Sequence, residues 1–365
     1  MATNEPSNRP ILGGDRVTIS EADDALALQA ATGFLGDRPA TLRRVTSGLS
    51  GGQVYQCSTA RGVLALKRWP LDTPAQRLDE VHAVQRFART SLDRVPELVP
   101  FQGTQCRASV GGFHFDLSTW MPGSPFSLPL RQPIADPRWT TAALDAVEKG
   151  ARAIAQFHRA THFLGCSSGI APAVLRRLQR LSELKTELPA TLPRAQSIGG
   201  AVGIAASGLR KHGPAMFQQS EAALRPWISR TVEIQWVLRD VHREHLLFEN
   251  GAVSGIVDFD AVRQDTRATD MARWIGSFAE LGIDGDALWK AAMSGYVCEQ
   301  AISPGELALA GAIEKASWAI QLANWVAWAG DVCQEIPGGI ESAQCRVAGL
   351  LRRSDGRLWG LGQLD

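Results

Sequence analysis

The sequence lacks an excess of either charge. Lysine and arginine together number 38 and aspartate and glutamate 37, so the formal net charge is +1. A chain without a net positive field has no general attraction for nucleic acid or for a lipid surface. We therefore expect neither nucleic acid nor a membrane among its partners.

Long apolar runs and closely spaced cysteines are also missing. No run of 18 apolar residues occurs, and the first ten residues are polar, without the apolar core of a signal peptide. The six cysteines are widely spaced, and none forms a C-x-x-C pair. Disulfide scaffolds concentrate cysteine in short secreted chains. These absences predict a cytoplasmic protein in a reducing compartment.

The common phosphate-binding signatures are absent as well. The glycine-rich segment Gly48-Leu49-Ser50-Gly51-Gly52 matches neither the G-x-x-x-x-G-K-[ST] of a P-loop nor the G-x-G-x-x-G of a dinucleotide fold. On its own this segment predicts only a turn between two strands.

Three regions differ in their patterns. Residues 1–40 form an extension with one helix, because 25–31 have high helix propensity. Residues 41–123 alternate short strand patterns with turn residues and hold one helical segment, at 78–88. Residues 124–365 are mostly helical in pattern.

The most informative segment runs from residue 231 to 270. A strand pattern up to Leu238 is followed by the polar run 239–245 and by the short apolar strand 246–248. Asn250-Gly251 predicts a tight hairpin, and the return strand, 253–257, ends at Asp258.

This hairpin predicts a meeting of polar side chains. Because a hairpin returns its second strand beside the first, Asp258 should lie next to the loop that holds Asp240 and His245. Two carboxylates and an imidazole would then converge. Carboxylates, together with the phosphates of a substrate, are the ligands that Mg²⁺ prefers.

The spacing of these residues is similar to a known pattern. Asp240-x-x-x-x-His245 followed by Asp258-Phe259 parallels the kinase order D-x-x-x-x-N, then D-F-G. The chain resembles the aminoglycoside phosphotransferase family of the protein-kinase-like fold, whose signature H-G-D-x-H-x-x-N-x-L-F precedes I-D-F/W. Here the corresponding residues are Leu238-Arg239-Asp240-Val241-His242-Arg243-Glu244-His245-Leu246-Leu247-Phe248 and Ile256-Val257-Asp258-Phe259.

The resemblance implies roles for these residues. Asp240 would accept or orient the proton of the substrate hydroxyl, and Asp258 would bind Mg²⁺. Asp270 matches a further family aspartate and would brace the catalytic loop, although a plain helix N-cap is the simpler interpretation. Arg239 stands where the family usually has glycine.

His245 departs from the family, which has asparagine at this position. Histidine offers nitrogen, which Mg²⁺ binds less readily than oxygen. Three interpretations stay open: His245 is a ligand that favours Mn²⁺, His245 hydrogen-bonds Asp240 while Asp258 holds the metal, or the site is impaired.

The first half of the chain supports the resemblance independently. Lys67 shares one face of a predicted strand with Val63, Ala65 and Trp69, so it lies on an otherwise apolar face and needs a partner. A nucleotide phosphate is the natural partner, and Glu80 corresponds to the glutamate that pairs with the kinase lysine. Together the predicted nucleotide-binding residues are Gly48, Ser50, Gly51, Gly52, Lys67, Glu80 and the hinge residues Trp120 and Met121.

We therefore predict an α+β, bilobal protein-kinase-like fold: a small antiparallel β N-lobe with one inserted helix (41–123) and a larger, mostly helical C-lobe (124–365). The predicted activity is transfer of the γ-phosphoryl group of ATP, with Mg²⁺ or Mn²⁺, to a hydroxyl of a small molecule. Asp240 and Lys67 are the predicted catalytic residues. Two alternatives are a pseudokinase that binds nucleotide without turnover and a metal-dependent hydrolase with Asp240, His242, His245 and Asp258 as ligands.

Overall fold

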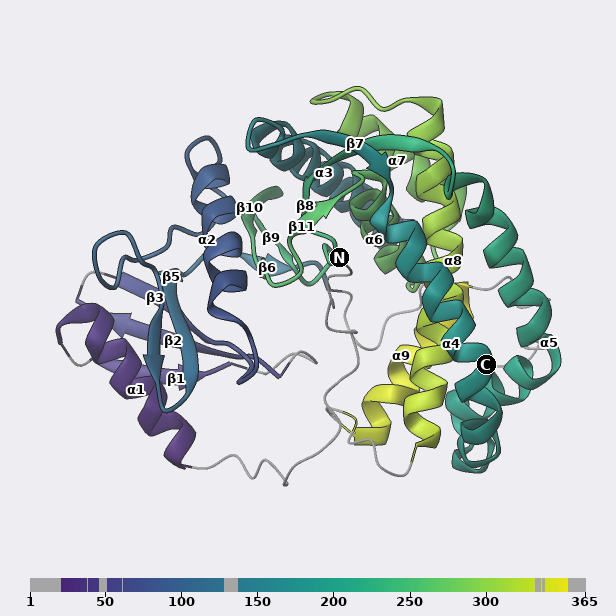
Figure 1. Cartoon of the computed structure of the whole chain (residues 1–365), viewed down its shortest axis with the longest axis horizontal. Helices are drawn as coiled ribbons and strands as arrows, with labels where there is room; N and C mark the ends of the chain where they lie inside the picture. Colours follow the sequence, from purple (N-terminus) through teal and green to yellow (C-terminus); the bar gives the residue numbers. More distant parts are fainter. Residues whose placement is uncertain are drawn as a thin grey trace. The chain divides into compact units, whose positions relative to one another are not determined.

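The computed structural model describes residues 21–37, 39–45, 51–60, 62–127, 137–331, 336 and 339–353, and this part of the chain divides into two compact units (Figure 1). The first unit takes the described residues up to His82, together with Glu97–Trp120 and Ile336. The second takes Ala83–Pro96 and the other described residues from Met121 onward.

A five-stranded antiparallel sheet with the strand order β1-β2-β3-β5-β4 forms the first unit. Helix α1 (Glu21–Leu35) packs on this sheet through Ala27, Ala30 and Ala31, whose i, i+3, i+4 spacing places them on one face. They meet buried strand residues that include Tyr55 and Leu66. The strands are β1 (Thr41–Arg44), β2 (Gln53–Thr59), β3 (Gly62–Arg68), β4 (Ala108–Val110) and β5 (Phe113–Thr119).

Helix α2 (Ala75–Arg89) is the helix inserted between β3 and β4. It begins in the first unit and, after His82, continues into the second. The loop that follows it joins the second unit through the backbone, because the Ile256 amide donates to the Arg94 carbonyl oxygen over 2.8 Å.

The second unit holds two small antiparallel sheets, in the orders β10-β9-β6 and β11-β8-β7. Their strands are β6 (Ser124–Pro125), β7 (Ser167–Ile170), β8 (Thr231–Val237), β9 (Leu246–Glu249), β10 (Ala252–Ile256) and β11 (Arg263–Asp265). The Asn-Gly hairpin is confirmed: Asn250 and Gly251 join β9 to β10 with φ angles of +50° and +74°.

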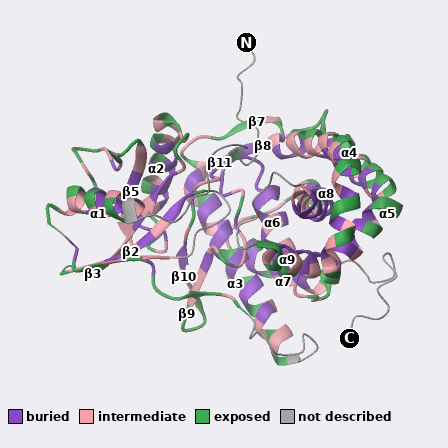
Figure 2. Ribbon diagram, turned by 90° about the horizontal axis from the view of Figure 1, so that it is seen from below, coloured by how far each residue is buried: buried purple, intermediate pink, exposed green. Residues whose placement is uncertain are grey.

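Helices make up most of the second unit. They are α3 (Pro137–His162), α4 (Pro172–Ile198), α5 (Gly200–Leu224), α6 (Ala268–Ala279), α7 (Gly285–Val297), α8 (Pro304–Gly330) and α9 (Gly339–Arg353), with a 3₁₀ turn at Arg225–Trp227. Helix α8 contacts α4, α5, α6 and α9 and is largely buried (Figure 2). Among the helices that the structure describes, none is both long and apolar enough to span a membrane. The predicted α+β fold class, with a sheet-rich part and a larger helical part, is confirmed.

The close contact between α3 and α7 depends on a glycine, which has no side chain. A Cβ atom added to Gly295 of α7 would lie 1.9 Å from the backbone oxygen of Glu148 in α3. We expect Gly295→Ala to lower the free energy of unfolding by about 1–3 kcal/mol, measured by urea denaturation, because the helices must move apart.

The matched control is Gly311→Ala in α8, where an added Cβ would meet no atom within 4 Å. This substitution should raise the free energy of unfolding by about 0.5–1 kcal/mol, because alanine is the better helix former. Equal effects at Gly295 and Gly311 would contradict the close approach of α3 and α7.

Candidate active site

The predicted polar cluster lies where β8 ends. After Val237 the chain leaves the sheet, passes through the loop 238–245 and enters the β9–β10 hairpin. Leu246 is opposite Ile256 in the hairpin, and the Val257 amide donates to the His245 carbonyl oxygen over 2.9 Å. The hairpin therefore returns the chain beside the start of β9.

This return brings His245 and Asp258 together. The Nε2 atom of His245 lies 3.4 Å from Oδ2 of Asp258. On the other side of the ring, Nδ1 lies 2.8 Å from the backbone oxygen of Asp240. The structure thus places His245 between Asp258 and the backbone, not the carboxylate, of Asp240.

Asp270 holds the start of the loop. This fully buried residue in the first turn of α6 accepts hydrogen bonds from the amides of Leu238 and Arg239, over 2.8 and 2.6 Å. Its carboxylate also accepts from Nε2 of His158 over 2.9 Å. Asp270 therefore connects α6 and α3 to the backbone immediately before Asp240.

A tyrosine extends this buried network. The Tyr296 hydroxyl of α7 lies 2.8 Å from Nδ1 of His158. Burial raises the pKa of Tyr296, so its hydroxyl is protonated and donates to Nδ1. The opposite nitrogen of His158 then donates to Asp270, and the chain of three side chains orients the carboxylate.

Two backbone conformations in this region are unusual. Arg239 and Asp258, which flank the loop and hairpin, have φ angles of +66° and +63°. Left-handed conformations cost non-glycine residues of the order of 1–3 kcal/mol and persist where the surroundings hold them. The Asp270 carboxylate is one such constraint, since it binds the Arg239 amide.

Arg273 is a site residue that the sequence analysis missed. It lies on α6 three residues after Asp270, and its Nε atom is 2.7 Å from Oδ1 of Asp240. The i, i+3 spacing puts both residues on one side of the helix. The same helix therefore holds the loop backbone through Asp270 and the Asp240 side chain through Arg273.

His242 packs against His245 inside the loop, with ring centroids 3.7 Å apart. Burial and then the positive charge of Arg273 hold the pKa of His242 far below its usual value, so the ring is neutral. Ligand atoms of Asp240, His242 and His245 lie within 4.8 Å of one another. The loop thus brings together three of the four ligands named for the hydrolase alternative, although Arg273 already binds the Asp240 carboxylate.

The surroundings of Lys67, in the first unit, differ from the prediction of an otherwise apolar face. Lys67 is half-buried, and its ammonium lies 4.8 Å from the ring centroid of Trp69. Its cross-strand neighbour on β5 is Asp116, a buried acid. That neighbour could not be identified from one strand, because the periodicity of β3 contains no information about its pairing with β5.

The expected pairing of Glu80 with Lys67 is also absent among the described contacts. Glu80 instead lies 3.4 Å from Arg77, one turn earlier on α2. The α2 residue directed at the sheet is His82, whose Nε2 is 3.0 Å from Asp116, and Trp69 donates to the same carboxylate over 2.5 Å. Two positions rotate a helix by about 200°, so Glu80 and His82 lie on nearly opposite faces of α2 and only one of them can meet the sheet.

The remaining predicted nucleotide-binding residues are described only in part. Gly48 and Ser50 lie outside the described residues. Gly51 has a φ angle of +73°, and Gly52 immediately precedes β2. The Trp120 amide donates to the Val63 carbonyl oxygen over 3.3 Å, and Met121 is buried.

Two features match the class of kinase-like phosphotransferases. One is the division into a sheet-rich part and a helical part, and the other is the loop between β8 and β9. Residues 41–309 match the model of the phosphotransferase enzyme family, which covers more than half of the chain. The chain belongs to this family, and it is an enzyme of the small-molecule phosphotransferase class. Among curated proteins, no sequence matches the chain significantly.

Solved structures share the fold at low sequence identity. An aminoglycoside phosphotransferase from Alicyclobacillus acidocaldarius is 16% identical, with a TM-score of 0.59 over 87% of this chain and 91% of that chain. A spectinomycin phosphotransferase in complex with ADP and spectinomycin is 9% identical, with a TM-score of 0.58 over 88% and 95%. An amicoumacin kinase in complex with AMP-PNP and Ca²⁺ is 11% identical, with a TM-score of 0.55 over 85% and 88%.

Proposed function

We propose that the protein transfers the γ-phosphoryl group of ATP to a hydroxyl group of a small molecule. The observation that carries this proposal is the convergence of His245 and Asp258, 3.4 Å apart, beside the loop that presents Asp240. Membership of the phosphotransferase enzyme family supports it, as do the adenine nucleotides bound by two proteins of the same fold. Asp240 would orient the acceptor hydroxyl and take its proton.

The pair His245 and Asp258 fits a divalent cation. Carbonyl oxygens only accept, so the Nδ1 atom of His245 carries a proton that it donates to the backbone of Asp240. In the neutral ring Nε2 then presents a lone pair toward the Asp258 carboxylate. A bound cation would neutralise phosphate charge, and the nitrogen donor favours Mn²⁺ over Mg²⁺.

His245→Asn tests this ligand assignment. Because the amide supplies oxygen in place of nitrogen, we expect the ratio of Mn²⁺-supported to Mg²⁺-supported kcat/KM to fall by about tenfold. The affinity of the ADP-bound protein for Mn²⁺, followed by electron paramagnetic resonance, should fall in parallel.

His114→Asn is the matched control, because His114 lies on β5 in the first unit, where its ring bonds Ser109. It should leave both measurements unchanged. An unaltered metal preference in His245→Asn would exclude His245 as a ligand and favour an ion pair between His245 and Asp258.

In the first unit, we assign Lys67 and the segment 48–52 to the phosphates of ATP. A strand lysine that packs on Trp69 has a defined position, and the amides of a glycine-rich turn are natural phosphate donors. Trp120 and Met121 would hold the adenine through backbone groups. These roles rest on the family pattern and on the half-buried position of Lys67.

The charge around the loop favours an acceptor that carries an anionic group. Burial lowers the pKa of Arg177 to about 10; the charge of Asp265 opposes this shift, and the charges of Arg176, Arg239 and Arg273 add to it. These arginines, from α4, α6 and the loop, are therefore near Arg177, and one of them, Arg273, contacts Asp240. A polycationic acceptor would be repelled here, whereas a carboxylate or phosphate would be attracted.

The direct test is a screen for ADP release with ATP, Mn²⁺ or Mg²⁺ and a library of hydroxyl compounds that are anionic, neutral or cationic. We expect turnover, with the anionic compounds preferred. Binding of ATP without turnover of any acceptor would favour the pseudokinase, and metal-dependent hydrolysis without ATP would favour the hydrolase.

A further inference from the structure

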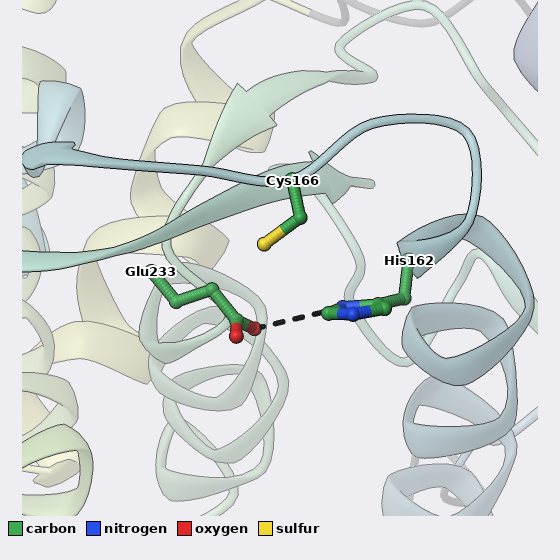
Figure 3. A group of neighbouring side chains, drawn as sticks. All are labelled: His162, Cys166 and Glu233. Atoms are coloured by element: carbon green, nitrogen blue, oxygen red, sulfur yellow. Dashed lines mark ion pairs between the residues drawn. The ribbon is translucent and has the colours of Figure 1, made fainter.

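A second cluster of metal-ligating side chains lies outside the catalytic loop, at the other end of β8. It consists of His162 in the last turn of α3, Cys166 in the following loop and Glu233 on β8. One ligand atom from each lies within 4.8 Å of the other two. Figure 3 shows the three side chains pointing into a common space from three separate segments.

The hydrogen bonds of Gln235 orient the ring of His162 and select its tautomer. The buried Gln235 amide donates through Nε2 to the His158 carbonyl oxygen, so its Oε1 faces Nδ1 of His162, 3.2 Å away. Nδ1 therefore carries the proton of the neutral ring, and Nε2 keeps its lone pair. A buried amide oxygen that orients an imidazole in this way is a common feature around metal ligands.

The Glu233 carboxylate has an oxygen with no hydrogen-bond donor. Its Oε1 atom is buried and accepts no hydrogen bond; it lies 3.9 Å from Nδ1 of His162 and 3.6 Å from Nε of Arg267. Arg267 donates to Glu306 over 2.5 Å, and its Nε atom, also without a hydrogen bond, forms only a longer ion pair with Glu233. Leaving a buried acceptor unbonded costs free energy, and a cation at this position would remove that cost.

Cys166 supplies a sulfur atom, and this ligand type determines which metals the site would bind. It is exposed and does not form a disulfide. Its sulfur lies within 4.8 Å of a ligand atom of His162 and of a carboxylate oxygen of Glu233. On metal binding its S–H bond breaks, the proton leaves to solvent and a sulfur–metal bond forms.

We propose that His162, Cys166 and Glu233 bind a thiophilic divalent cation, Zn²⁺ among the physiological ions, with water as a fourth ligand. One sulfur, one imidazole nitrogen and one carboxylate oxygen are all accepted by tetrahedral Zn²⁺. Ligand atoms in such a site lie about 3.3–3.7 Å apart, so the side chains need to move by only about 1 Å.

Such a site would stabilise the base of the catalytic loop. It joins the end of α3, which carries His158, to β8, which leads directly into Leu238. Its role would be structural, because its ligands are distinct from Asp240, His245 and Asp258.

Cobalt substitution tests the proposal on the full-length protein. Addition of Co²⁺ should produce a near-ultraviolet band from thiolate-to-metal charge transfer, at one equivalent per chain, together with visible bands of tetrahedral Co²⁺. The loop cluster of Asp240, His242 and His245 contains no sulfur, so it cannot give the charge-transfer band. Zn²⁺ should displace the cobalt and raise Tm.

Cys166→Ser should abolish the charge-transfer band, and His162→Ala should weaken Co²⁺ binding by tenfold or more. Cys298→Ser is the control, because Cys298 is also exposed and reduced but belongs to neither group of possible metal ligands among the described residues; it should keep the band. No band in the wild-type protein, or a band that persists in Cys166→Ser, would overturn the site, and neither result bears on phosphoryl transfer.

Discussion

Replacing Asp240 by asparagine is expected to reduce kcat by a factor of about 10²–10⁴, the usual contribution of a general base. Asparagine has nearly the same shape and can still accept a hydrogen bond from Arg273, which lies 2.7 Å from the Asp240 carboxylate. It cannot take a proton from an acceptor hydroxyl. The loss should therefore fall on turnover, while the Kd for ATP, measured by calorimetry, stays within about threefold.

The control for this experiment is Asp145→Asn on α3. Asp145 is exposed and pairs with Lys149, one turn away on the same helix. Surface pairs of this kind contribute at most about 1 kcal/mol to stability, and this one lies outside the loop. Its turnover should be unchanged. If Asp240→Asn kept more than a tenth of wild-type turnover, the proposed role of Asp240 would be wrong.

Replacing Asp270 by alanine is expected to lower the free energy of unfolding by about 3–5 kcal/mol, because each buried donor left without an acceptor costs about 1–3 kcal/mol. The substitution leaves two loop amides and the His158 imidazole without their shared acceptor. It also releases the left-handed conformation of Arg239, so turnover should be lost even in the folded fraction. Urea denaturation and assays at saturating ATP measure the two effects separately.

Asp286→Ala offers a comparison at an equivalent place in another helix. Asp286 lies in the first turn of α7, as Asp270 does in α6, but it is exposed. Its loss should lower the free energy of unfolding by only about 0.3–1 kcal/mol, the value of a surface charge at a helix start.

Asp270→Asn keeps the side-chain volume and should fold, yet it should still lose turnover because its amide group adds a donor where three donors converge. If Asp270→Ala and Asp286→Ala lowered the free energy of unfolding by similar amounts, Asp270 would only cap its helix and would not hold the loop.

Several features of the protein could be predicted from the sequence because they depend on residues that are close together in the chain. The Asn-Gly turn determined the β9–β10 hairpin, and the hairpin determined that Asp258 returns beside His245. The strand pattern of β8 and the helix propensity of residues 25–31 in α1 were equally local. Such patterns are short-range, since backbone geometry and side-chain periodicity decide them within one element or one turn.

Contacts between residues of elements far apart in the chain could not be predicted from the sequence in this way. The pairing of β3 with β5 places Asp116 beside Lys67, and the face that α2 turns to the sheet selects His82 over Glu80. Likewise, α6 brings Arg273 to Asp240, although 33 positions separate them. Each of these contacts depends on helix rotation or strand register, which are set by packing in the whole core.

The sequence by itself therefore determined the fold class, the catalytic-loop pattern and the hairpin that joins its two acidic ends. Only the tertiary structure decided which charges surround that pattern, and it alone brought His162, Cys166 and Glu233 together. The physical reason is that local periodicity specifies which side of an element is buried, whereas the identity of the neighbour on that side depends on how distant segments pack.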